Sequence, residues 1–230
     1  HLFYWNAAVR IALQTDTPGL IDQLQSLAPE IEAFVMPSAD GANEPVLADV
    51  FVSSAAAVGT EALIKRCKGL RWVHILGTGV DTFPLHLVAD KLVSCSRGAT
   101  AVPIAEWVLA MLLAHEKQLP QRWVSEPPQT WYMADLGCLE NKTLGIIGFG
   151  NTGSQLALRA KAFEMNLLFN DPSDVNDALA ARIGAKRVEK EQLYREADFV
   201  SVCTDLNDTS RGMIDAAVKP VPSPQDSTRP

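Results

Sequence analysis

Short apolar runs and longer stretches with apolar residues at helical spacing alternate along the chain, which predicts strands and helices in turn. In the first part we expect strand 9–13, helix 19–28, the turn-rich stretch 37–45, strand 48–54, helix 60–67, strand 70–76, loop 77–81 and strand 92–96. Such alternation favours an α/β fold with parallel sheets.

The second part repeats the alternation after one long helix. We expect helix 103–117, connector 119–131, strand 143–148, helix 154–163, strand 166–171, helix 174–184, strand 186–188, helix 190–197, strand 198–204 and a helix start at 208–213. Helix 103–117 is apolar on most sides, so we expect it to be buried between layers. Pro103 suits its first position, because an N–H group is not needed there.

These elements predict two domains and a tail. Residues 1–102 form a first, small α/β domain, residues 103–219 a second α/β domain, and residues 220–230 an irregular end. The tail carries four prolines and almost no apolar periodicity, which is typical of irregular structure.

Composition narrows the classes of function. The chain has 230 residues, 47% of them hydrophobic, and a formal net charge of −7, so it lacks the basic surface of a general nucleic-acid binder. No apolar run reaches the roughly 20 residues that cross a bilayer, and we expect no membrane partner. The four cysteines form no C-x-x-C pair, which favours idle thiols in a reducing cytoplasm and no metal site. A reactive Cys203, at the end of a predicted strand, is the less favoured alternative.

The segment GIIGFGNTG carries the clearest chemistry. Gly148, Gly150 and Gly153 make the pattern G-x-G-x-x-G between an apolar strand and an amphipathic helix. The first glycine allows a tight turn, the second lets the backbone approach a pyrophosphate, and the third lets helix and strand pack closely. The N–H groups of Asn151 and Thr152 are expected to face the phosphates, where the helix dipole favours negative charge.

An acid follows at the spacing that a ribose-binding carboxylate requires. Asp171 ends the next strand, about 20 residues beyond Gly153. A carboxylate there accepts hydrogen bonds from both ribose hydroxyls and repels a 2′-phosphate. Since no arginine follows in the next few positions, the sequence favours NAD over NADP. The alternative is that Asp171 only caps the following turn.

Four ordered motifs resemble those of the D-isomer-specific 2-hydroxyacid dehydrogenases, over about residues 45–219. They are LRWVHILGTGVD, PIAEWVLAMLLA, LGCLENKTLGIIGFGNTG and ADFVSVCTDLNDTSRGMID. The resemblance implies that residues 1–102 are a flavodoxin-like substrate domain and residues 103–219 an incomplete doubly wound Rossmann NAD-binding domain. It also implies a homodimer formed through this second domain, and hydride transfer between NAD and a small 2-hydroxy or 2-oxo acid.

The resemblance assigns roles to two further segments. Gly77, Thr78 and Gly79 would present N–H groups to a substrate carboxylate, with Thr78 near the nicotinamide, although the residues alone indicate only a glycine-rich strand exit. Thr204 would lie against the cofactor. Cys203 and Asp205 stand where the family usually has histidine and proline. Glu106 and His115, on the long helix, are expected to be structural.

The family's catalytic arginine, glutamate and histidine lie later in the chain than these motifs, so we assign no catalytic residue. All four histidines, His1, His74, His86 and His115, precede the cofactor turn. Arg229 falls near the family's arginine spacing, but the prolines before it make a poor strand, and we interpret the spacing as coincidence. The change to Pro-rich sequence after residue 219 suggests a truncated or frame-shifted gene product, which the DNA sequence beyond codon 219 tests. A non-catalytic NAD-binding or dimerising module and an inactive fragment remain alternatives.

Overall fold

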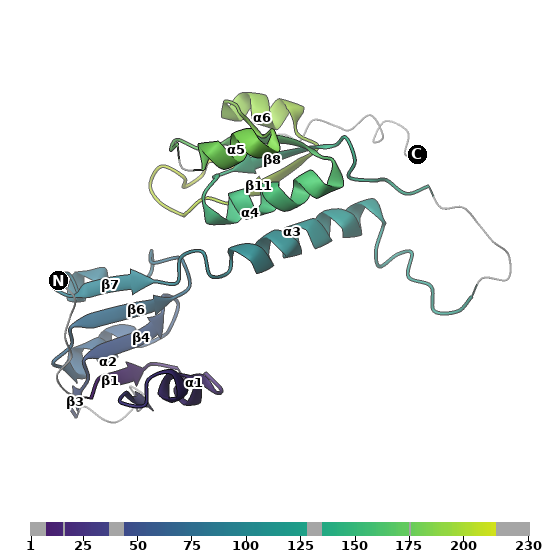
Figure 1. The fold of residues 1–230 in the computed structure, drawn as a ribbon. Coiled ribbons are helices and arrows are strands. Elements are labelled where there is room, and N and C mark those ends of the chain that lie inside the picture. Colours follow the sequence, from purple (N-terminus) through teal and green to yellow (C-terminus); the bar gives the residue numbers. More distant parts are fainter. Residues whose placement is uncertain (1–7, 16, 37–43, 128–134, 175, 215–230) are drawn as a thin grey trace. The chain divides into compact units, whose positions relative to one another are not determined.

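The computed structural model describes residues 8–15, 17–36, 44–127, 135–174 and 176–214 (Figure 1). The chain divides into two compact units, His1–Arg97 and Gly98–Pro230. Each unit contains its own parallel sheet and its own buried core, as expected for two α/β domains. The expected irregular tail at 220–230, with Arg229, lies outside the described residues.

The first unit is built around a five-stranded parallel sheet in the order β2-β1-β4-β6-β7. Counted along these five strands the order is 2-1-3-4-5, the flavodoxin-like arrangement. Its strands are β1 (Arg10–Leu13), β2 (Glu32–Val35), β4 (Val50–Ser54), β6 (Trp72–Leu76) and β7 (Leu92–Cys95). The helices of this unit are α1 (Leu20–Leu27), α2 (Thr60–Arg66) and the short 3-10 helix η1 (Leu85–Leu87). Two further short strands, β3 (Val46–Leu47) and β5 (Cys67–Lys68), pair with each other in a separate sheet.

Alternate residues of these strands supply two cores. Phe51, Val73 and Ile75 pack on one face with Leu63 and Ile64 of α2. On the other face Ile11, Leu13 and Val50 pack with apolar residues of α1. Because successive side chains of a strand point to opposite faces, the short apolar runs of the sequence serve both layers.

The second unit has a four-stranded parallel sheet in the order β10-β9-β8-β11, the first four strands of the doubly wound order 3-2-1-4. Its elements are α3 (Ala101–Glu116), β8 (Thr143–Ile147), α4 (Asn151–Ala160), η2 (Lys161–Phe163), β9 (Asn166–Asn170), α5 (Asp177–Ile183), β10 (Lys186–Arg187), α6 (Lys190–Glu196) and β11 (Phe199–Val202). The larger core lies where Ile146 and Phe169 of the sheet meet α4 and Leu109 of α3. On the opposite face Leu193 of α6 packs on Ile147 and Leu168.

Helix α3 differs from its sequence prediction in two ways. It begins at Ala101, so Pro103 lies inside the first turn, where its missing N–H still costs no intrahelical bond. The expectation that α3 is buried between layers is also wrong. Only its face with Ala105 and Leu109 packs on the core, to which α4 also contributes. Trp107 on the other face is 63% exposed.

Two further expectations need correction. Strand β2 was absent from the sequence prediction, and it forms because Glu32–Val35 pairs in parallel with Arg10–Leu13. Residues 208–213 form turns rather than the start of a helix. The side chain of Asn207 accepts hydrogen bonds from the N–H groups of Thr209 and Ser210, which closes the chain locally.

A buried ion pair anchors the end of α3 to the sheet. Glu116 is 6% exposed, and its Oε1 accepts a hydrogen bond from Lys142 Nζ at 2.9 Å. A Cβ atom at Gly137 would overlap the Glu116 carboxylate, so a larger residue there would require the Glu116 side chain to shift. Removing the lysine leaves a buried carboxylate without its cation.

We therefore expect Lys142→Met to lower the free energy of unfolding by about 2 kcal/mol, below the full cost of breaking a buried pair because Lys142 is partly exposed. Urea denaturation measures the change. Arg195→Met is the matched control, since Arg195 and Glu196 are exposed and 3.5 Å apart, and it should change stability by under about 0.5 kcal/mol. Equal effects of the two variants would contradict the anchoring role.

Candidate functional site

The glycine turn lies at the carboxyl end of β8, at the centre of the second sheet. The N–H of Gly148 donates to Asn170 O at 2.8 Å, and that of Cys203 donates to Ile147 O at 2.7 Å, so the turn follows directly on the ladder. Gly148 adopts φ 89°, a left-handed conformation that favours glycine. The carboxyl edge of a parallel sheet, where the strand order reverses, is the usual ligand site in such folds.

The other two glycines of the motif have different surroundings. A Cβ atom at Gly153 would overlap Gly148 O and lie 3.0 Å from Ile146 Cγ2, so α4 packs here only with glycine. A Cβ atom at Gly150 would meet nothing within 4 Å, so this side of the turn is open. Helix α4 begins at Asn151, and no side chain among the described residues caps it. Its first N–H groups, those of Asn151 and Thr152, therefore lie at a helix N-terminus that favours an anion.

Asp171 lies against this turn from the end of β9. Its Oδ2 accepts a hydrogen bond from the N–H of Phe149 at 2.6 Å, and its Oδ1 accepts from the N–H and the hydroxyl of Ser173 at 2.8 and 2.6 Å. Burial raises the pKa of Asp171, but these hydrogen bonds and the charge of Arg187 outweigh it and hold the pKa below its ordinary value. The carboxylate is thus charged at neutral pH and is already held beside the glycine turn. Asp171 does bind the turn that follows it, through Ser173, but it also binds the glycine motif.

Two residues that the sequence motif did not include hold the same region. Asn176 donates from Nδ2 to Phe149 O at 2.9 Å, so both backbone polar groups of Phe149 bind side chains from beyond β9. Arg187 of β10 donates to the carbonyl oxygens of Asp171 and Ser173 and lies over the Phe169 ring. Arg187 is 16 positions from Asp171 in sequence, and the pairing of β10 with β9 brings it near.

Thr204 lies beside the first glycine of the turn. A Cβ atom at Gly148 would be 2.7 Å from Cys203 O and 3.0 Å from Thr204 N, so this glycine also allows the end of β11 to approach. Burial raises the pKa of the Cys203 thiol above its ordinary value, partly offset by a hydrogen bond with Ser201. The thiol is therefore protonated at neutral pH, which argues against Cys203 as a nucleophile.

The expected substrate loop belongs to the first unit. Gly77 directly follows β6, has φ 99°, and accepts a hydrogen bond from Ser96 N–H at 3.0 Å. Thr78 and Gly79 are exposed. The structure thus groups Gly148, Gly150, Asn151, Thr152, Gly153, Asp171 and Thr204 in the second unit, and Gly77, Thr78 and Gly79 at one strand end of the first.

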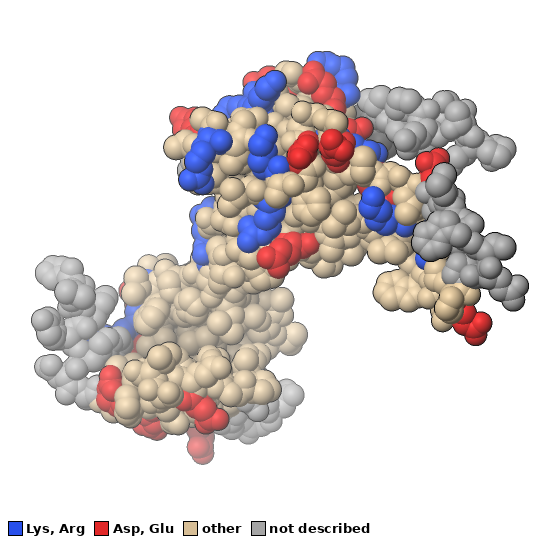
Figure 2. All heavy atoms as spheres, turned by 45° about the vertical axis from the view of Figure 1, so that its right-hand side comes forward, with Lys and Arg blue, Asp and Glu red and all other residues tan. Residues whose placement is uncertain are grey.

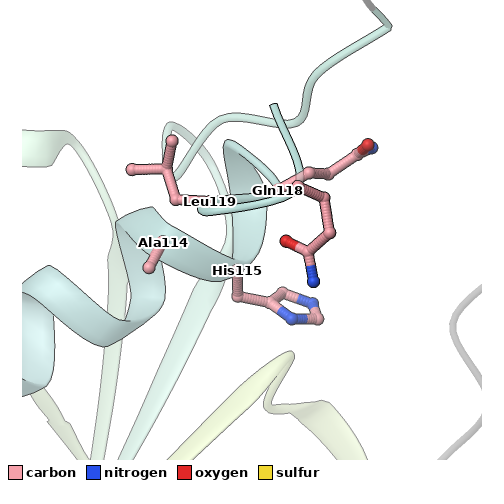
Figure 3. Close-up of a pocket in the computed structure, with 5 residues that line it drawn as sticks. Ala114, His115, Gln118 and Leu119 are labelled. Carbon is pink, nitrogen blue, oxygen red and sulfur yellow. The ribbon is translucent and has the colours of Figure 1, made fainter. Parts of the chain in front are cut away.

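The two α3 residues that were expected to be structural make local contacts. Glu106 lies 3.6 Å from Arg159 of α4 as a partly exposed ion pair. His115 lies edge-on to Phe199 with ring centroids 5.9 Å apart. His115 also lines a cavity of about 550 Å³ with Ala114, Gln118, Leu119 and Gln121 (Figure 3). The cavity lies at the C-terminal end of α3, whereas Gly98, which is close to Asn151, precedes the N-terminal end of that helix. This cavity is separate from the glycine turn.

On the face that Figure 2 shows, Lys and Arg side chains are interspersed with Asp and Glu rather than gathered into one basic surface. In the part of the chain that the structure describes, no group of three or more His, Cys, Asp or Glu residues is placed to hold a metal ion. Within the same residues, no helix combines the length and the apolar character that crossing a membrane requires.

Comparison with known proteins adds to this geometry. Residues 109–218 match the NAD binding domain of the D-isomer specific 2-hydroxyacid dehydrogenases. The chain is 31% identical over 170 residues to hydroxypyruvate reductase of Thermotoga maritima. The aligned residues make up 72% of this chain and 54% of that protein. The chain is also 30% identical over 172 residues to D-3-phosphoglycerate dehydrogenase of Methanocaldococcus jannaschii, covering 73% and 33%. The chain therefore spans about half and a third of the length of these relatives.

Solved structures show the same fold. The holo form of Rhodotorula graminis D-mandelate dehydrogenase has a TM-score of 0.71 at 20% identity, covering 92% of this chain and 70% of that one. The D-lactate dehydrogenase of Escherichia coli has a TM-score of 0.69 at 18% identity, covering 91% and 69%. At these identities the likeness concerns the fold alone.

Proposed function

Because the chain belongs to the D-isomer-specific 2-hydroxyacid dehydrogenase family, we propose that it supplies the cofactor-binding unit and a substrate-binding unit of an NAD-dependent oxidoreductase. Its substrates would be small 2-hydroxy or 2-oxo acids. The observation that supports this most is the Asp171 carboxylate held 2.6 Å from the N–H of Phe149, inside the glycine turn. That arrangement joins a phosphate-binding helix end to a ribose-binding acid.

The described residues fit NAD, the cofactor of this domain. The open side at Gly150 leaves room for a pyrophosphate, and the N–H groups of Asn151 and Thr152 would bind it. Gly148 and Gly153 would keep the backbone close to the cofactor, and Thr204 would contact it beyond the first glycine. Asp171 would accept a hydrogen bond from the adenosine ribose. Three of the roughly four acceptor sites of its carboxylate receive hydrogen bonds from the protein, which leaves about one, on Oδ2, for a ribose hydroxyl.

The substrate would be held by the loop after β6. The N–H groups of Gly77, Thr78 and Gly79 would bind its carboxylate, and the left-handed conformation of Gly77 supports a turn that exposes backbone donors. Bound NAD supplies hydride transfer to or from the C2 carbon. This chain's own residues would orient cofactor and substrate, and no residue here is assigned the accompanying proton transfer.

Two measurements on the full chain test the proposal. NADH binding is measured by calorimetry, and oxidation of NADH is followed at 340 nm with glyoxylate, hydroxypyruvate or pyruvate. Turnover above buffer supports the oxidoreductase. Binding without turnover favours the non-catalytic NAD-binding module, and absence of binding rejects both.

We further propose that the protein acts in the cytoplasm. Its four cysteines are all free thiols, which supports a reducing compartment.

We further propose that the chain forms a homodimer through the exposed face of α3. Ile104, Trp107 and Met111 are 42%, 63% and 45% exposed, and their spacing places them on one face of the helix. Light scattering after gel filtration should give twice the chain mass, and Trp107→Glu should give the mass of one chain. Val58→Glu, at a 96% exposed position of the first unit, is the control and should stay dimeric. A single-chain mass for the unaltered protein would reject the dimer.

A further inference from the structure

Arg187 is the centre of a charged cluster next to the proposed ribose site. Its Nη2 donates to Asp177 Oδ1 at 2.5 Å and to Ser173 O at 2.8 Å, and it lies 3.6 Å from Asp174 Oδ1. Its Nη1 donates to the backbone oxygen of Asp171. One arginine of β10 thus binds four residues that follow β9. We call Arg187 with Asp171, Ser173, Asp174 and Asp177 the arginine cluster.

Besides its hydrogen bonds and ion pairs, the arginine cluster is held by packing on an aromatic ring. Parallel pairing places Arg187 opposite Phe169, and its guanidinium carbon lies 5.0 Å from the centre of that ring. Phe169 in turn stacks on Phe149, with ring centroids 4.1 Å apart. The guanidinium is thus connected by packing to the residue whose N–H binds Asp171. A substitution at Arg187 should therefore weaken the hydrogen bond between Asp171 and the N–H of Phe149 in the glycine turn.

An arginine at this position could also bind a phosphate group of the cofactor. A guanidinium binds phosphate groups through paired hydrogen bonds, and an arginine near the ribose is how this fold accommodates a 2′-phosphate. Arg187 lies at the backbone oxygen of Asp171, the residue expected to bind the ribose. Its donors are nevertheless directed at two carbonyl oxygens and at two aspartates. Asp174 and Asp177 thereby add negative charge beside the ribose site and occupy the arginine at the same time.

We propose that Asp174 and Asp177 withhold Arg187 from a 2′-phosphate and make it a positioning residue for Asp171, so that the arginine cluster enforces the choice of NAD over NADP. This inference rests on the proposed cofactor site. It goes beyond the repulsion that Asp171 exerts by itself. The selectivity would come from a network in which the only role of the arginine is to hold the acid in place.

Three variants of the full chain test the inference, with NADH and NADPH titrated separately by calorimetry. Arg187→Gln should weaken NADH binding roughly tenfold, because the backbone oxygens of Asp171 and Ser173 lose the guanidinium that ties this segment to β10. Asp174→Asn combined with Asp177→Asn frees the guanidinium and should raise NADPH affinity relative to NADH by roughly tenfold. Arg182→Gln removes an equal charge from α5, where Arg182 is exposed and makes no ion pair with the described residues, and should leave both affinities unchanged.

Hydrogen exchange gives a readout that needs no cofactor. Arg187→Gln should speed exchange of the N–H groups of Phe149 and Ser173, both of which donate to Asp171, while Arg182→Gln should not. An unchanged ratio of NADH to NADPH affinity in the aspartate variants, in a protein that binds NADH, overturns the selectivity and leaves the proposed function standing. Unchanged exchange in Arg187→Gln overturns the positioning role. Failure of the unaltered chain to bind NADH rejects the proposed function together with the selectivity.

Discussion

Replacing Gly153 with alanine is expected to abolish NADH binding and to lower the free energy of unfolding by about 3 kcal/mol, the upper end of the usual cost of overpacking. The added methyl group would overlap the carbonyl oxygen of Gly148 and lie 3.0 Å from Ile146 Cγ2. Since the overlapped atom belongs to the backbone, no side-chain rotation relieves it. Helix α4 would have to move away from β8, and the N–H groups at its start would move with it. The N–H groups that are proposed to bind the pyrophosphate would then be misplaced, so calorimetry should detect no NADH binding.

Gly150→Ala separates binding from folding at the same turn. Its methyl group would meet nothing within 4 Å, and φ at this position is −71°, outside the left-handed region that favours glycine. We expect the free energy of unfolding to stay the same or rise by roughly 0.5 kcal/mol. NADH affinity should fall, because the methyl group projects into the open side proposed for the pyrophosphate. Urea denaturation and calorimetry on both variants decide the point. Equal stability of Gly153→Ala and Gly150→Ala would contradict the packing argument.

The sequence was sufficient to predict the parts of the fold that depend on local pattern. The apolar strand, the three glycines and the helix after them predicted β8, the turn and α4, although α4 begins at Asn151 rather than at Ser154. The spacing from Gly153 to Asp171 predicted an acid at the end of β9, where the structure has it. The roles of these residues toward NAD remain predictions. The positions of these residues were predictable because the strand, the turn and the helix form one continuous segment whose geometry depends on local sequence.

Features that depend on pairing between distant segments were missed. Strand β2 has a weak pattern, EAFV, and only its pairing with β1 makes it a strand. Sequence spacing does not point to Arg187, because this residue lies 16 positions after Asp171, beyond the few residues in which a cation near the ribose is expected. The parallel register of β10 and β9 brings it back to that position. The burial of α3 was overestimated because hydrophobicity indicates that a helix has partners but not how many of its faces are covered.

Replacing Asp171 with alanine is expected to raise the Kd for NADH roughly a hundredfold, which corresponds to about 2.7 kcal/mol. Two contributions add: the ribose loses a charged acceptor, and the N–H of Phe149 loses the oxygen it donates to at 2.6 Å. Asp171→Asn keeps an oxygen for Phe149 but removes the charge, so its affinity for NADH should lie between those of the parent and the alanine variant. Its affinity for NADPH should exceed the parent's, since the repulsion of a 2′-phosphate is gone. Calorimetry with both dinucleotides measures these differences.

Asp198→Ala is the matched control for this prediction. Asp198 also accepts a hydrogen bond from a backbone N–H, that of Thr143, at 2.7 Å, but at the amino ends of the strands. Its loss should lower stability by about 1 kcal/mol while leaving NADH affinity unchanged. If both alanine variants bound NADH equally well, Asp171 would be a structural acid like Asp198, and the ribose role would be wrong. The lowered pKa of Asp171 adds a further check. As the pH falls, any loss of NADH affinity that comes from protonating Asp171 should begin at a lower pH than for an aspartate with its ordinary pKa.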